Sequence, residues 1–369
     1  MKFKLGIIGA TGFIGTPYRE EIRQCSDDAE IIALCARRRD RLEAAAKLDG
    51  AQFITDNWRE VVEHPHVDTV LVLTPDALHL EPVLAAAAKG KHVVCEKPIG
   101  ANAAEASQMW QAYKSRGLGH FVPLWARCTD VFVRAKEMIR EGQLGDIKAF
   151  VYRWQNPRPE SMPFTWRDDA ALSSAGSIAD VGTHAYDAVR WLLQDEAIRV
   201  CSQATVLTPP KPDLGSVDLR EALDWAGGHS RGDQSATRKS STYDYATLTV
   251  ECGRGALGVF VLSHATYLRK GFTPELELHG TKASIGINRV ERTITLCNNT
   301  NGEVEVVHRF SEDKSFNRFK QFVFPALRAR IAGNPGEFPG IDDGWRSQVF
   351  TDAAVASVKS KQWEEVAPV

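Results

Sequence analysis

An acid and a base stand together at Glu96 and Lys97, directly before Pro98. The apolar run 91–95, which follows Gly90, predicts a buried parallel strand that ends at this pair. Open α/β sheets bind ligands at the carboxyl ends of their strands, and a partly desolvated lysine can take part in proton transfer. Lys97 is therefore a candidate catalytic residue. The pair alone is equally typical of a solvated surface loop.

A second candidate pair lies near the middle of the chain, where Asp180 and His184 are four residues apart. On a helix, or on the approach to its N-terminus, this spacing places both side chains on one side. Histidine titrates near neutral pH and a carboxylate can orient it, so the two could transfer a proton. The alternative is structural, with Asp180 as a helix cap and His184 packed in the first turn. The small residues 175–177 indicate a close backbone approach.

A glycine loop at residues 9–15 follows an apolar strand and precedes a helix that extends to residue 23. Glycines at such a turn permit a tight bend and let backbone N–H groups approach a pyrophosphate, which the helix N-terminus also favours. The spacing GxxGxxG is one residue longer than the usual GxGxxG. We expect the loop to bind a dinucleotide. The expected contacts are Gly9, Thr11, Gly12, Phe13 and Ile14.

Three arginines, Arg37, Arg38 and Arg39, follow the second strand at 30–36. In NAD-binding folds an acidic residue here holds the adenosine ribose 2′-hydroxyl, whereas arginine pairs with a 2′-phosphate through charge-assisted hydrogen bonds. We therefore expect NADP(H) to be favoured over NAD(H), with Arg37 and Arg38 as contacts. The alternative is that these arginines only cap the helix at 41–48.

Alternating strands and helices continue to residue 124, the pattern of βαβ units in a parallel sheet. The strand ends bring the glycine loop, the arginines, Thr74–Pro75 and Glu96–Lys97 to one sheet edge. Between residues 149 and 309, eight strand-like runs with hairpin turns predict a large, mostly antiparallel sheet. We predict an α/β Rossmann domain over 1–125 and an α+β domain over 126–369. Helices at 316–332 and 343–360 close the chain, and we expect the last to pack on the first domain.

The stretch 208–241 has no sustained period apart from a possible short helix at 220–225. A loop of this length in a compact domain is usually functional or disordered. We expect a substrate-side flap or an oligomer contact.

Composition favours a small-molecule partner. The 369 residues are 43% hydrophobic and 25% charged, and the formal charge of -2 provides no basic footprint for nucleic acid. The seven cysteines are an odd number without a CxxC pair, which argues against a disulfide framework and a zinc site and favours reduced thiols in a cytoplasmic protein. No signal peptide or apolar stretch long enough for a membrane span is expected.

Several motifs in a fixed order resemble the family of glucose-fructose oxidoreductase, inositol dehydrogenase and rhizopine catabolism proteins, written Gfo/Idh/MocA. These are the glycine loop, Thr74–Pro75 with His79, and residues 90–98, 142–145, 180–184, 280–284 and 342–344. The resemblance implies an N-terminal domain that binds NAD(P) and a C-terminal open-faced sheet that forms the substrate wall and the interface of a homodimer or homotetramer. It also implies a cis bond before Pro98, with Lys97 beside the reacting hydroxyl.

The resemblance further implies roles for individual residues. The implied cofactor contacts are Thr74, Pro75, His79, Glu96, Lys97 and Arg127. The implied substrate contacts are Lys97, Trp166, Arg167, Asp180 and His184, with His184 as the proton donor or acceptor. Two departures concern the site: the longer glycine loop, and Ser174–Ala175 in place of glycines often found before the Asp180 segment. The stretch 208–241 has no family counterpart that we can align.

We therefore predict reversible oxidation of a secondary alcohol on a sugar, polyol or sugar derivative, with hydride transfer to NADP+. A reductase of a non-sugar substrate, of the dihydrodiol or tetrapyrrole type, is the alternative within the enzyme class. An alternative from another class is a non-catalytic NAD(P)-binding sensor of the same fold. The intact Lys97, Asp180 and His184 argue against the sensor, which needs no proton relay.

Overall fold

The computed structural model describes residues 1–230, 232, 236–313 and 315–369, and these form two compact units. The first unit contains residues 1–123, Asp218–Arg220 and 315–345. The second contains the described residues of 124–217, 221–313 and 346–369. Both units therefore combine segments that are distant in the sequence.

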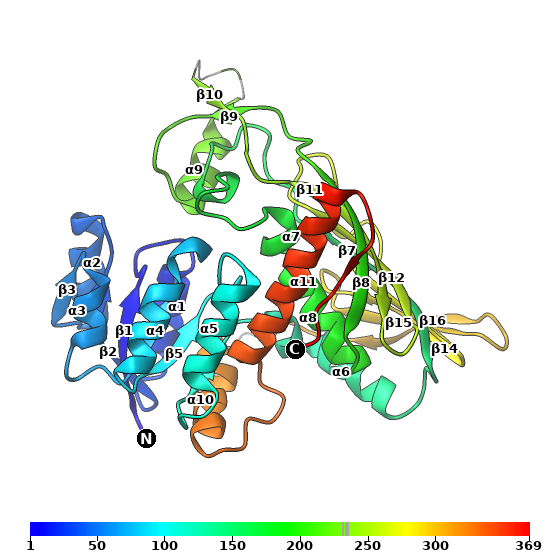
Figure 1. Cartoon of the computed structure of the whole chain (residues 1–369), viewed down its shortest axis with the longest axis horizontal. Coiled ribbons are helices and arrows are strands. Elements are labelled where there is room, and N and C mark those ends of the chain that lie inside the picture. Colours follow the sequence, from blue (N-terminus) through cyan, green and yellow to red (C-terminus); the bar gives the residue numbers. More distant parts are fainter. Residues whose placement is uncertain (231, 233–235, 314) are drawn as a thin grey trace. The chain divides into compact units, whose positions relative to one another are not determined.

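The first unit is built on a six-stranded parallel sheet in the order β3-β2-β1-β4-β5-β6 (Figure 1). The strands are β1 (Phe3–Ile8), β2 (Ala29–Cys35), β3 (Phe53–Thr55), β4 (Thr69–Val72), β5 (His92–Cys95) and β6 (His120–Phe121). β4 and β5 are buried at every position, as expected for parallel strands covered on both faces. The strand order reverses between β1 and β4, which is where open α/β sheets bind ligands.

Helices pack on this sheet, most of them between its strands as the sequence predicts. They are α1 (Gly15–Arg23), α2 (Arg39–Asp49), α3 (Trp58–Glu63), α4 (Leu80–Ala88), α5 (Ala103–Tyr113) and α10 (Phe324–Ile331), with a 3-10 turn η1 (Asp76–Leu78) and a π turn η5 (Phe319–Val323) before α10. β6 contains only two residues, although the predicted alternation of strands and helices continues to residue 124. The Val122 N–H donates to the Pro339 carbonyl at 3.3 Å, so it leaves the sheet, and Pro123 has no N–H to offer.

The second unit is built on a nine-stranded sheet in the order β16-β15-β14-β13-β7-β12-β11-β8-β17. Its strands are β7 (Ile147–Gln155), β8 (Ala197–Thr205), β11 (Tyr245–Cys252), β12 (Leu257–Ser263), β13 (Leu276–Gly280), β14 (Ala283–Asn288), β15 (Thr293–Asn298), β16 (Val304–Arg309) and β17 (Glu364–Glu365). Only β7 and β12 pair in parallel. The predicted fold class, a Rossmann sheet followed by a large and mostly antiparallel sheet, is confirmed.

Helices α6 (Asp130–Arg140), α7 (Ser177–Asp180) and α8 (Gly182–Leu193) pack on this sheet. Burial alternates along β11 and β14, so one sheet face is covered and the other is more accessible. The last helix, α11 (Ile341–Ser360), lies where the sequence predicts a helix.

The stretch 208–241 contains the short strands β9 (Lys211–Pro212) and β10 (Thr237–Arg238) and the helix α9 (Leu219–Gly228). The short helix predicted at 220–225 is therefore confirmed. Lys211 anchors the stretch, because its ammonium lies 2.6 Å from the Asp168 carboxylate and both side chains are only 5% exposed. Residues 231 and 233–235 lie outside the described part.

Candidate functional site

The glycine loop is packed against the carboxyl ends of two strands. Gly9 has φ +83°, and a Cβ on it would lie 2.6 Å from the Leu73 carbonyl oxygen after β4, so only glycine fits. The N–H groups of Gly9 and Ala10 both donate to the carbonyl of Cys35, the last residue of β2, at 3.0 and 3.1 Å. The loop therefore holds the start of α1 beside the ends of β2 and β4.

The loop and α1 fit the pyrophosphate of a dinucleotide. A Cβ on Gly12 would meet only the Gly9 carbonyl oxygen, at 3.4 Å, so the backbone is open to a ligand there. Ile14, the residue at the N-cap of α1, makes no side-chain cap bond, and the described first turn holds no acidic residue. Within the first turn, the Thr16 N–H donates to the Gly12 carbonyl at 3.2 Å and Pro17 has no N–H. The Gly15 N–H and the dipole of α1 therefore suit an anion. Residues 11–14 of the loop are half-buried.

The arginines after β2 belong partly to the next helix. α2 begins at Arg39, two residues earlier than expected, and Arg39 Nε donates to Glu43 Oε1 at 2.8 Å. Arg37 and Arg38 are exposed and precede the helix. The helix-capping alternative is not supported for Arg38, because this N-cap residue makes no side-chain cap bond within the described chain.

Glu96 links the candidate lysine to α1. Its side chain is buried, with the Tyr18 hydroxyl donating to Oε1 at 2.5 Å and the Lys97 N–H donating to Oε2 at 3.2 Å. Burial raises the pKa of Glu96 above its usual range, against the opposing effects of Lys97 and the Tyr18 hydroxyl. Glu96 therefore ties the helix that begins at the glycine loop to the turn that carries Lys97.

His79 joins two neighbouring strand ends. Its ring is buried, with Nδ1 at 3.0 Å from the Pro98 carbonyl oxygen and Nε2 at 2.8 Å from that of Thr74. The Lys97–Pro98 peptide bond is cis, as the resemblance implies. The loops after β4 and β5, which carry the predicted Thr74–Pro75 and Glu96–Lys97 contacts, are therefore held together by this imidazole.

Replacing Tyr18 by Phe should destabilise the protein in a pH-dependent way. Because the folded-state pKa of Glu96 is raised, ionising this carboxyl costs stability as the pH rises through that value, and the Tyr18 hydroxyl reduces the cost. The loss should be about 1.5–3 kcal/mol where Glu96 is ionised and about 0.5–1.5 kcal/mol where it is protonated. Urea unfolding over a series of pH values that covers the titration of Glu96 measures the difference.

Tyr113→Phe is the matched control. Tyr113 is equally buried, but its hydroxyl donates to the neutral Lys91 carbonyl at 3.1 Å. Its loss of stability should be about 0.5–1.5 kcal/mol throughout the same pH series. Equal pH dependence in the two variants would contradict the role assigned to the Tyr18–Glu96 bond.

In the second unit, Asp180 and His184 lie on successive helices. Asp180 ends α7 and His184 lies in the first turn of α8. The small residues before them approach the backbone that precedes β11: Gly176 has φ +56°, and a Cβ on it would lie 2.1 Å from the Tyr243 carbonyl oxygen. The Ser177 N–H donates to the same oxygen at 2.7 Å. The predicted close approach is thus a packing contact within the unit.

The Asp180 carboxylate lies close to two arginines and a histidine. Its Oδ2 lies 2.9 Å from His264 Nε2, 3.4 Å from Arg158 Nη2 and 3.7 Å from Arg167 Nε. Arg167 also packs its guanidinium 4.3 Å from the centre of the Trp166 ring. The structure therefore groups three predicted substrate residues, Trp166, Arg167 and Asp180. Sequence reasoning missed Arg158 and His264. For His264, its position directly after β12 could have indicated a site residue, whereas no sequence signal marks Arg158.

His184 stacks against an aromatic residue that sequence reasoning also missed. Its imidazole is nearly parallel to the Trp154 ring, at 14° and 5.2 Å between centres, and its side chain is buried. Trp154 lies on β7, and the Arg289 guanidinium packs 4.0 Å from its ring. Arg289 Nε in turn lies 3.1 Å from Glu275 Oε2. Strand β7 thus fixes the plane of the imidazole.

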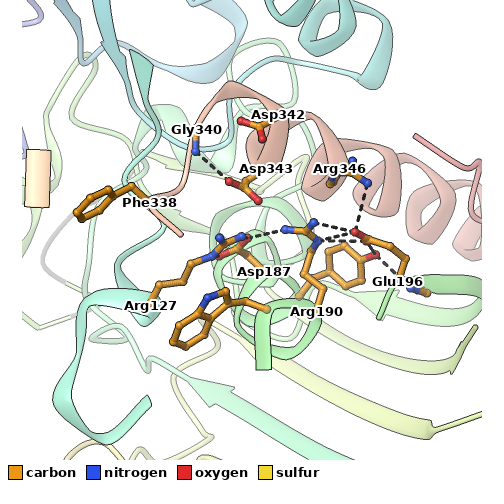
Figure 2. A network of polar contacts seen from close by, with 12 residues as sticks. Arg127, Asp187, Arg190, Glu196, Phe338, Gly340, Asp342, Asp343 and Arg346 are labelled. Atoms are coloured by element: carbon orange, nitrogen blue, oxygen red, sulfur yellow. Dashed lines mark hydrogen bonds and ion pairs between the residues drawn. The ribbon is translucent and has the colours of Figure 1, made fainter. Parts of the chain in front are cut away.

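Arg127 anchors the helix that carries His184. Its guanidinium donates through Nε and Nη2 to the carboxylate of Asp187, which is fully buried and one turn beyond His184 on α8 (Figure 2). Arg190 Nη1 lies 3.4 Å from the same carboxylate and also binds Glu196. Arg127, predicted from the resemblance as a cofactor contact, therefore also has a structural bond that orients α8.

Two further observations concern the described residues. They contain no group of three or more His, Cys, Asp or Glu side chains arranged to hold a metal ion. None of their helices is both long and apolar enough to cross a membrane.

Known proteins resemble the chain over most of its length. Residues 3–122 match the NAD-binding Rossmann domain of the GFO/IDH/MocA oxidoreductase family, and residues 132–286 match the GFO/IDH/MocA C-terminal domain. Levoglucosan dehydrogenase of Pseudarthrobacter phenanthrenivorans is 26% identical, over 87% of this chain and 86% of that protein. Myo-inositol 2-dehydrogenase of Thermotoga maritima is 27% identical, over 97% of each.

A solved structure shares the fold. It is a levoglucosan dehydrogenase in complex with NADH and levoglucosan, with a TM-score of 0.83 at 22% identity over 100% of both chains. The two domain matches together span three quarters of the sequence in the order that the sheets require. The chain therefore belongs to the GFO/IDH/MocA family and is an NAD(P)-dependent oxidoreductase.

Proposed function

We propose that the chain transfers a hydride between NADP(H) and a secondary alcohol or ketone of a sugar, polyol or sugar derivative. The observation that carries this proposal is the group around Asp180, in which Arg158, Arg167 and His264 lie near the carboxylate and Arg167 also packs on the Trp166 ring. Such a surface offers hydrogen bonds to hydroxyl groups and an apolar face for a sugar ring. The relatives named for levoglucosan and myo-inositol support the same substrate class.

Each candidate residue then has a role in alcohol oxidation. His184 takes the hydroxyl proton as the carbonyl forms, and Lys97 assists by hydrogen bonding to the same oxygen. Asp180 orients the substrate or the imidazole. When bound, the nicotinamide accepts the hydride at C4. The stacking on Trp154 restricts rotation of the His184 ring, so the proton acceptor is held in one orientation.

The cofactor would be held by the first unit. The glycine loop and α1 bind the pyrophosphate, and the predicted contacts at Thr74, Pro75, His79, Glu96 and Lys97 surround the nicotinamide half. Arg37 and Arg38 bind the adenosine 2′-phosphate, which is the reason for preferring NADP(H). Near residue 125 the chain first passes from this cofactor unit to the substrate unit, and residues 218–220 and 315–345 return to the cofactor unit.

A homodimer or homotetramer through the C-terminal sheet is part of the proposal. The more accessible face of that sheet, with half-exposed positions alternating along β14, supports it. A cytoplasmic location is also proposed, since all seven cysteines are free thiols.

Initial rates across a substrate panel test the function. The purified chain is assayed with NADP+ and NAD+ against levoglucosan, myo-inositol, glucose and a trans-dihydrodiol, following the nicotinamide absorbance. We expect cofactor reduction with a sugar or polyol and a higher kcat/KM for NADP+. Turnover of the dihydrodiol alone would favour the non-sugar alternative. Cofactor binding without any turnover would favour the sensor, and a preference for NAD+ would exclude the proposed role of the arginines.

A further inference from the structure

Asp218 lies among the arginines that follow β2. Together with Leu219 and Arg220 it belongs to the first unit, although it comes from the stretch 208–241. Its Oδ2 lies 3.1 Å from Arg41 Nη1, at hydrogen-bond distance, and 3.8 Å from Arg38 Nη2. Arg38 is the N-cap residue of α2 and Arg41 lies in its first turn. One carboxylate therefore bridges two guanidinium groups at the start of this helix.

These guanidinium groups lie where the adenosine ribose of a dinucleotide is expected. In a Rossmann sheet the ribose lies beyond the carboxyl end of β2, beside the glycine loop. Here the N–H groups of Gly9 and Ala10 bond the Cys35 carbonyl at that strand end, and Arg38 follows Cys35 by three residues. A 2′-phosphate would accept hydrogen bonds from guanidinium N–H groups such as the one that Arg41 donates to the Asp218 carboxylate.

We propose that Asp218 is an intramolecular competitor for the adenosine 2′-phosphate and thereby limits the preference for NADP(H) over NAD(H). This inference rests on the proposed NADP(H) site. A guanidinium N–H that donates to the Asp218 carboxylate is not available to the phosphate, and the two anions repel each other at short range. NADP(H) must therefore displace Asp218, whereas the uncharged 2′-hydroxyl of NAD(H) leaves the pair intact.

Asp218 lies within 4 Å of both Arg38 and Arg41. Arg39 instead pairs at 2.8 Å with Glu43, one turn further along α2. The Asp218 side chain is 23% exposed, while those of Arg38 and Arg41 are 43% and 37% exposed. Ion pairs with this exposure are individually weak, so a phosphate that carries about two negative charges can replace the carboxylate.

Asp218→Asn tests the proposal through cofactor binding alone. Asparagine keeps the shape and removes the charge, so the Kd for NADPH should fall about tenfold, because two half-exposed pairs are together worth about one order of magnitude. The Kd for NADH should change by less than about twofold. Isothermal titration of the full chain with each cofactor, at an ionic strength of about 0.1 M, measures both values.

Two variants control the measurement. Asp224→Asn removes an acidic charge from the exposed surface of α9, the helix that begins directly after Asp218, and should leave both Kd values unchanged. Asp218→Glu keeps the charge and should bind NADPH as the unaltered chain does. If Asp224→Asn tightens NADPH binding as much as Asp218→Asn, net charge rather than the Asp218 contact is responsible and the proposal fails.

The outcomes separate this proposal from the function itself. Unchanged NADPH affinity in Asp218→Asn, or equal gains for NADPH and NADH, overturns the role of Asp218 while sugar oxidation stands. Failure of the unaltered chain to bind either cofactor overturns the proposed function. A third result supports the proposal: NADPH binding is tighter in Asp218→Asn, and this gain is lost in the double variant Asp218→Asn, Arg41→Gln. Arg41 is then the donor that becomes available to the phosphate.

Discussion

Replacing Lys97 by Ala is expected to reduce kcat by on the order of 10²-fold or more, as the loss of a group that assists proton transfer does. The Lys97 side chain is half-buried at the carboxyl end of β5, after Glu96. Its backbone is fixed independently of its ammonium, since the Lys97 N–H donates to Glu96 Oε2. The turn should therefore keep its conformation in the variant, and the glycine loop should bind the pyrophosphate as before.

Steady-state rates with the best substrate of the panel, together with the Kd for NADPH, separate these effects. The Kd should change by less than about threefold, because phosphate contacts dominate cofactor binding in the proposed site. Lys89→Ala is the control, since Lys89 is exposed at the end of α4 and eight residues from Lys97. Full activity in Lys97→Ala would remove this residue from the mechanism.

Replacing Asp187 by Asn is expected to destabilise the second unit by about 3–5 kcal/mol. Asp187 is fully buried, and the Arg127 side chain that donates to it is only 7% exposed. Asparagine would leave this buried guanidinium without its bidentate carboxylate partner. Because α8 carries His184, the same change should also lower activity.

The urea transition of the second unit, followed by tryptophan fluorescence, measures the loss of stability. Glu137→Gln is the control: it removes a carboxylate 2.9 Å from Arg134, but its side chain is 50% exposed. Such a surface pair should contribute less than about 1 kcal/mol. A similarly small loss in Asp187→Asn would show that Arg127 does not depend on this carboxylate.

The sequence by itself determined the order of strands and helices, because the apolar runs of β1, β4 and β5 and the alternation in the later strands are local patterns. It also placed Glu96 and Lys97 at a strand end and predicted the cis bond before Pro98 through the family resemblance. The three-residue strand β3 and the helix α3 were not predicted, since such short elements have too few residues to show a period.

Only the tertiary structure decided which side chains surround the candidate residues. Arg127 and its partner Asp187 are 60 residues apart, and Arg41 and Asp218 are 177 apart. His264 and Asp180 likewise come from different elements. Strand and helix periods are set by near neighbours in the chain, whereas these ion pairs depend on how sheets and loops pack. No local pattern could therefore reveal that Asp218 faces the arginines after β2.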